Sequence, residues 1–146
     1  MQNAPDQVLL VINSGSSSLK FSINKIASPL QTLYRGEITA IGETSRFQVN
    51  DHQNNRLHEH PITVSDHAQA VRVLLDWLEK EAANVEIIAA GHRVVHGGIR
   101  FHAPVLITEE VIAYLHILIP LAPSHQSANL QGSHHRPATM PVSEWK

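Results

Sequence analysis

The sequence predicts an α/β domain built on a mixed β-sheet with flanking helices. Two observations carry this prediction. Short apolar or alternating segments dominate the first half of the chain, and segments with helical spacing alternate with a buried strand farther on. The resulting order, strands first and then helix, strand and helix, is typical of an α/β arrangement. A chain of 146 residues, 42% hydrophobic and 16% charged, fits one ordinary globular domain.

The first two expected strands flank a short polar loop. Val8–Ile12 is an unbroken apolar run, which is typical of a strand buried on both faces. After the loop, Leu19, Phe21 and Ile23 alternate with polar residues, which predicts a second strand. Weaker strand patterns follow at 32–41, 46–50 and 56–62, and Asp51–Asn55 is a plausible turn between the last two.

Two amphipathic helices and one further strand are expected in the second half. Ser65 or Asp66 can cap the first helix, and Val85–Ala90 reads as a buried strand after it. Thr108 is a good N-cap for the second helix, which Pro120 ends. The apolar faces of the two helices consist of Val71, Leu74, Leu75, Leu78 and Ala82 in the first, and Val111, Ile112, Leu115 and Ile119 in the second.

Composition excludes several classes of function. A formal charge of -2 provides no basic field, so general nucleic-acid binding is not expected. The absence of cysteine excludes disulfides, thiolate metal sites and cysteine nucleophiles. The start of the chain lacks a basic n-region, and no apolar stretch approaches membrane-spanning length. We therefore expect a cytoplasmic protein without a membrane segment. No spacing organises the 11 histidines into a metal site.

The loop Asn13–Lys20, with the sequence NSGSSSLK, is the first candidate for chemistry. A phosphate-binding loop needs free backbone N–H groups, small side chains and a nearby cation, and this stretch supplies all three. It lacks the second glycine and the Lys-Ser/Thr pair of a Walker A loop, and a strand follows it instead of a helix. Composition alone leaves two alternatives open: a phosphate-cradling hairpin turn or a serine-rich surface turn.

Two motifs together resemble the signatures of the acetate kinase family, which includes propionate and butyrate kinases. VLLVINSGSSSLKFSI resembles the first signature and AAGHRVVHGG the second. RFHAPVLITEEV and LAPSHQSANLQG continue the resemblance in order, so that it covers about residues 7 to 132.

The resemblance implies a ribonuclease-H-like domain of the actin-like, sugar-kinase-like ATPase superfamily. Two such domains face each other across a cleft in the family. It also implies transfer of the γ-phosphoryl group of ATP to a short-chain carboxylate such as acetate, with Mg²⁺, to give an acyl phosphate and ADP. The family usually works as a homodimer.

The family's site residues carry over by motif position. The resemblance implies that Asn13 helps to hold Mg²⁺ through a water molecule, which suits an ion that keeps several waters. Ser16, Ser18 and Lys20 would meet the phosphates of the nucleotide. Arg93 would bind the carboxylate substrate through its planar fork of donors. Val95 would line the pocket for the acyl chain, and His125 would border it. Apart from the motif, the alternative for Arg93 is a buried strand arginine paired with an acidic residue.

The sequence departs from the family pattern in two places. The family commonly has Leu-His-Asn-Pro where this chain has Ser124–Ser127, so the preferred carboxylate stays open. From Ser133 onward the chain no longer resembles the family, and Ser133–Lys146 is expected to be an irregular tail. The catalytic aspartate of the family and its second, nucleotide-binding domain have no counterpart in these residues.

These departures leave the origin and the role of the chain open. A shifted reading frame, a recombination join and a genuine short gene would each produce such a change at Ser133. We therefore expect residues 1–132 to be an incomplete N-terminal kinase domain that is inactive by itself. The alternative is a small non-catalytic module that keeps the phosphate loop and binds a protein partner.

Overall fold

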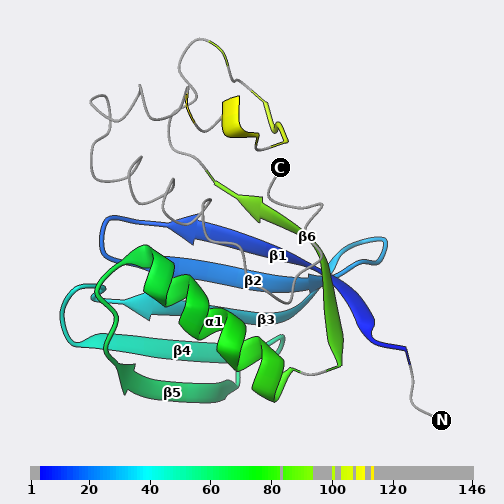
Figure 1. Cartoon of the computed structure of the whole chain (residues 1–146). Coiled ribbons are helices and arrows are strands. Elements are labelled where there is room, and N and C mark those ends of the chain that lie inside the picture. The colour runs from blue at the N-terminus through cyan, green and yellow to red at the C-terminus, as the bar shows by residue number, and fades with distance from the viewer. Residues whose placement is uncertain are drawn as a thin grey trace.

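A six-stranded sheet with one long helix across it forms the framework of the chain (Figure 1). The computed structural model describes residues 4–82, 84–93, 100, 103–106, 108–110 and 113. The strands are β1 (Asp6–Ser14), β2 (Leu19–Lys25), β3 (Gln31–Thr39), β4 (Ser45–Asp51), β5 (Arg56–Ile62) and β6 (Val85–His92), and the helix α1 is His67–Glu81. Their order in the sheet is β5-β4-β3-β2-β1-β6.

The sheet is mixed because only its last pair is parallel. β1 to β5 form an antiparallel meander, whereas β1 and β6 run in the same direction. A parallel partner requires a crossover connection, and α1 provides it by spanning from the β5 edge to the β6 edge. The mixed sheet and the order of elements confirm the predicted α/β class.

Alternation along β1 and β2 decides which side chains form the core. Leu10, Ile12, Leu19 and Ile23 are fully buried, whereas Val11, Lys20 and Ser22 on the opposite face are partly or fully exposed. The alternation breaks at Asn24, which is also buried. The buried face packs against α1, and a single cluster contains Val71, Leu74 and Leu78 of the helix together with the strand residues. Trp77 completes this layer by edge-on contacts with Tyr34 and Phe47.

The helix begins at Asp66, which is one of the two expected caps. The Asp66 carboxylate accepts a hydrogen bond from the Gln69 N–H at 2.9 Å, and the Gln69 side chain accepts one from the Ser65 N–H at 2.8 Å. The first bond satisfies one of the amides that the first turn of a helix leaves without partners, and the second ties the residue before the cap to that turn. Lys80 in the last turn complements the negative end of the helix dipole.

The turn at Asp51–Asn55 is confirmed. Its Asp51 carboxylate accepts hydrogen bonds from the N–H groups of Gln53 and Asn55, and Asn54 adopts a positive φ of 67°. Of the second expected helix, Glu109, Glu110 and Ala113 are helical, and its other residues lie outside those that the structure describes. No helix among the described residues is long and apolar enough to span a membrane.

Candidate phosphate and carboxylate site

The parallel pairing of β1 and β6 brings the two sequence motifs to one end of the sheet. Ile12 pairs with His92, and the Arg93 N–H donates to the Ile12 carbonyl at 3.1 Å. The serine loop, defined here as Gly15–Ser18 between β1 and β2, follows β1 directly, so that this loop and Arg93 both lie beyond the carboxyl ends of β1 and β6. Figure 1 shows the start of α1 at the same end of the sheet. In α/β folds, the carboxyl ends of parallel strands are where ligands commonly bind.

Most carbonyl groups of the serine loop accept hydrogen bonds from other parts of the chain. The Gly15 N–H donates to the Ser18 carbonyl at 2.8 Å, and the Ile41 N–H donates to the Ser17 carbonyl at 2.9 Å. The ring Nε2 of His67 lies 2.7 Å from the Gly15 carbonyl and 3.2 Å from the Ser18 carbonyl. Three of the four loop carbonyls therefore have donors.

The amides of Ser16, Ser17 and Ser18 show the opposite pattern. None of the three N–H groups has an acceptor within the part of the chain that the structure describes. The Ser16 and Ser17 residues are exposed, and Ser18 is half-buried with its hydroxyl over Gly15. Successive free N–H groups in a turn form a concave site for an anion.

Asn13 and Lys20 stand beside this loop on the face of the sheet opposite α1. They are direct partners across the β1–β2 ladder, and their neighbours Ile12 and Leu19 point into the core. Asn13 is half-buried and Lys20 is exposed. The pairing places an amide and an ammonium group next to each other on the sheet. Each of the two residues is separated from the loop by one residue of its strand.

His92 connects the loop to Arg93. Its Nδ1 lies 2.8 Å from the Arg93 carbonyl, which can only accept, so Nδ1 carries a proton. Burial lowers the pKa of His92 from 6.5 to about 4, an effect that the nearby His67 reinforces and the bond to Arg93 opposes. The ring is therefore neutral at pH 7, and its Nε2 accepts from the Ser14 hydroxyl at 3.2 Å.

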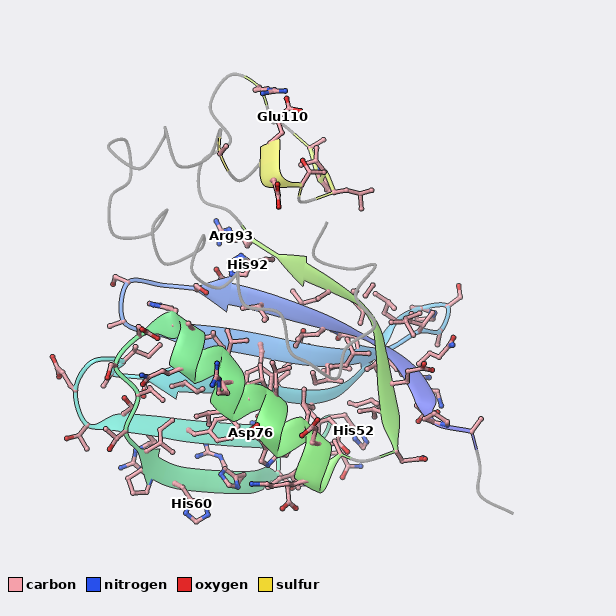
Figure 2. All side chains as sticks on the ribbon, viewed as in Figure 1. His52, His60, Asp76, His92, Arg93 and Glu110 are labelled. Carbon is pink, nitrogen blue, oxygen red and sulfur yellow. The ribbon has the colours of Figure 1, made fainter. Side chains whose placement is uncertain are left out.

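Figure 2 shows His92 and Arg93 together at the end of β6. Arg93 is exposed, so the alternative of a buried strand arginine is wrong for its described position. Its side chain is available to a ligand at this end of the sheet. Val95 and His125, the other residues expected at the carboxylate site, lie outside the described residues.

One described side chain, that of Asn13, fits an indirect contact with Mg²⁺. No group of three or more His, Asp or Glu side chains could hold a metal ion in the described ranges. Asn13 contributes one neutral amide beside the loop, which suits a hydrogen bond to a water of the ion's hydration shell.

Comparisons with known proteins identify the family to which the chain is similar. The family model of the acetokinase family matches residues 8–144. The acetate kinase of Methylocella silvestris is 38% identical over 135 residues, which are 85% of this chain and 33% of that protein. The acetate kinase of Thermotoga petrophila is 42% identical over 132 residues, which are 85% of this chain and 32% of that protein.

Solved structures give the same result. The crystal structure of Porphyromonas gingivalis acetate kinase has a TM-score of 0.76 at 32% identity, over 86% of this chain and 33% of that one. A propionate kinase from Francisella tularensis has a TM-score of 0.72 at 30% identity, over 86% of this chain and 32% of that one. The fold is therefore that of the actin-like ATPase superfamily, as the resemblance implied.

The chain belongs to the acetokinase family, a family of kinases. It spans about a third of the length of the curated relatives that it matches.

Two residues of this site were not identified from the sequence. His67 occupies the first position of α1 and is only 5% exposed, and Ser14 is 1% exposed at the end of β1. His67 is three, four and seven residues before Ala70, Val71 and Leu74, so the helical period is the signal that could have placed it on the buried face. Ser14 continues the inward alternation of Leu10 and Ile12.

Proposed function

We propose that this chain provides the phosphate-facing and carboxylate-facing wall of a site that transfers a phosphoryl group from ATP to a short-chain carboxylate. The carboxylate oxygen forms a bond to the γ-phosphorus, and the bond from that phosphorus to the β,γ-bridging oxygen breaks. The electron pair of the broken bond leaves with ADP, and the product is an acyl phosphate.

The observation that carries this proposal is the meeting of the serine loop and Arg93 at the carboxyl ends of β1 and β6. The loop offers N–H groups to phosphate oxygens, and Lys20 adds a positive charge at its exit. Arg93 offers a planar pair of donors that matches the two oxygens of a carboxylate. Phosphoryl transfer depends mostly on positioning and on neutralising charge, and these groups serve both purposes.

The remaining parts of the proposal differ in their support. Asn13 would contact Mg²⁺ bound to ATP through a water, and the ion would supply charge neutralisation at the phosphates. The hydroxyl groups of Ser16 and Ser18 would contact the phosphate together with the N–H groups of the loop. Family membership supports ATP and a short-chain carboxylate as ligands. The homodimer, the cytoplasmic location, the roles of Val95 and His125 and the division at residue 132 stay predictions.

Separate binding measurements on the 146-residue chain test the two halves of the site. Binding is the readout because the chain spans only a third of the relatives' length. In NMR titrations, pyrophosphate should shift the amide signals of Ser16–Ser18, and acetate should shift the side-chain Nε–H of Arg93. Lys20→Gln should weaken only pyrophosphate binding. Arg93→Gln should weaken only acetate binding, by about 10-fold or more, because a charged hydrogen-bond donor is lost.

Arg72→Gln is the matched control, since Arg72 is an exposed arginine on α1. It should leave both titrations unchanged. If Arg93→Gln and Arg72→Gln affect acetate binding equally, the carboxylate role of Arg93 is wrong. If pyrophosphate leaves the Ser16–Ser18 amides of the parent chain unshifted, the phosphate role of the loop is wrong.

A further inference from the structure

The His67 side chain is a buried polar group that the proposed reaction does not use directly. It lies at the start of α1, 52 residues along the chain from Gly15, yet its ring reaches the serine loop. It is one of four buried polar or charged residues in the described part of the chain. A buried imidazole is costly unless its nitrogen atoms find partners, so its contacts indicate what it does.

The chemistry of the contact assigns the proton. Nε2 of His67 faces two carbonyl oxygens, of Gly15 at 2.7 Å and of Ser18 at 3.2 Å. Carbonyl oxygens only accept hydrogen bonds, so Nε2 must carry the proton. One N–H group is thereby shared between the first and the last residue of the loop.

This shared donor replaces a bond that the backbone could otherwise make. In a turn closed by the Gly15 N–H on the Ser18 carbonyl, the Ser18 N–H could return the bond to the Gly15 carbonyl. Within the described residues, that return bond is not formed, and His67 occupies the Gly15 carbonyl in its place. The Ser18 amide then stays available beside those of Ser16 and Ser17.

We infer that His67 is a positioning residue for the phosphate loop: its Nε2–H ties the Gly15 and Ser18 carbonyls to α1 and leaves the Ser16–Ser18 amides free for phosphate oxygens. The phosphate part of this inference rests on the proposed function. It also explains why a histidine stands on the apolar face of α1, since the ring both packs in the buried layer and donates. The crossover helix thus sets the conformation of a loop that precedes it by some fifty residues.

The test compares His67→Phe, which keeps a ring but removes the donor, with His67→Gln, whose amide can still donate. The first measurement is the ring ¹⁵N spectrum of the parent, in which the Nε2 of His67 should be protonated. The second is the set of Ser16–Ser18 amide shifts in each variant without ligand. The third is a pyrophosphate titration of each variant. His52→Phe is the matched control, because His52 is exposed in the β4–β5 turn.

His67→Phe should displace the Ser16–Ser18 amide signals and weaken pyrophosphate binding about 10-fold, as expected for the loss of a donor to two carbonyls. His67→Gln should restore binding to within about threefold of the parent. The control should match the parent. A merely space-filling role predicts the reverse, because phenylalanine would then substitute better than glutamine.

Unchanged loop amides and unchanged pyrophosphate affinity in a folded His67→Phe chain would overturn the inference, as would an unprotonated Nε2 in the parent. Should the phenyl ring prevent folding, His67→Asn takes its place, because its amide is too short to reach both carbonyls. A parent chain that does not respond to pyrophosphate would refute the proposed function. The ring ¹⁵N shift and the ligand-free amide shifts would still decide whether His67 positions the loop.

Discussion

At the scale of single residues, His92 shows how burial changes the chemistry of a side chain in this site. Its ring donates to the Arg93 carbonyl and accepts from the Ser14 hydroxyl, an arrangement that only a neutral imidazole can make. His92 therefore joins the end of β1 to the residue that presents the guanidinium group.

The lowered pKa of His92 predicts a pH-dependent stability. Between pH 6.5 and about 4, the unfolded chain binds a proton at this residue and the folded chain does not. Stability therefore falls as the pH drops through this window, with a slope of at most about 1.4 kcal/mol per pH unit from this residue. Above pH 6.5 the ring is neutral in both states and contributes no pH dependence. Urea unfolding from pH 4 to 8 measures this slope.

His92→Gln is the comparison for this measurement. The variant should lose the His92 part of the slope between pH 6.5 and 4. His58, whose pKa burial also lowers, contributes in the same direction, and the difference between parent and variant removes its share. An NMR titration in which His92 protonates near 6.5 would contradict the prediction.

At the scale of elements, close contact between β2, β3 and β4 depends on one glycine. A Cβ atom at Gly36 of β3 would lie 2.4 Å from Cζ of Phe21 and 2.3 Å from the Gln48 carbonyl oxygen. Phe21 and Phe47 pack beside this point with ring centroids 6.2 Å apart. The backbone of β3 therefore passes where any larger residue would overlap its neighbours.

Gly36→Ala should destabilise the fold by about 1–3 kcal/mol, because the added methyl group must push the Phe21 ring and the sheet backbone apart. Gly91→Ala in β6 is the matched control, since no described atom lies within 4 Å of its added Cβ. Chemical denaturation of both variants gives the comparison. Equal stabilities would show that β3 can move to accept the methyl group.

At the scale of the whole molecule, one buried layer between α1 and the sheet holds the described part of the chain together. Leu74 of the helix is fully buried in the same cluster as Leu10 and Ile12 of β1 and Phe47 of β4. Since these residues lie far apart in the sequence and belong to both the helix and the sheet, loss of the layer should unfold helix and sheet together.

Leu74→Ala should therefore lower the free energy of unfolding by about 2–5 kcal/mol through the lost burial and the cavity that remains. The fluorescence of Trp77 and the far-UV circular dichroism should report the same midpoint. Leu57→Ala is the control, because Leu57 on β5 is 51% exposed. Separate midpoints for the two signals would mean that α1 leaves the sheet before the strands separate.

Local patterns in the sequence determined the elements and the motifs. The alternation of Leu19, Phe21 and Ile23 and the spacing of Val71, Leu74 and Leu78 depend on residues close in the chain, so each strand and helix followed from its own stretch. The sequence allowed Ser65 or Asp66 as the helix cap, and Asp66 is the N-cap in the structure. The two signatures by themselves indicated the family.

Only the tertiary structure decided how distant residues meet. The parallel pairing of Ile12 with His92 brings Arg93 to the serine loop, and no local pattern specifies a partner 80 residues away. The helical period could have placed His67 on the buried face, but its bond to the Gly15 carbonyl depends on where α1 crosses the sheet. Helices and strands depend on residues that are close in the chain, so the sequence determined them. The site depends on contacts across the core between distant residues, so only the tertiary structure determined it.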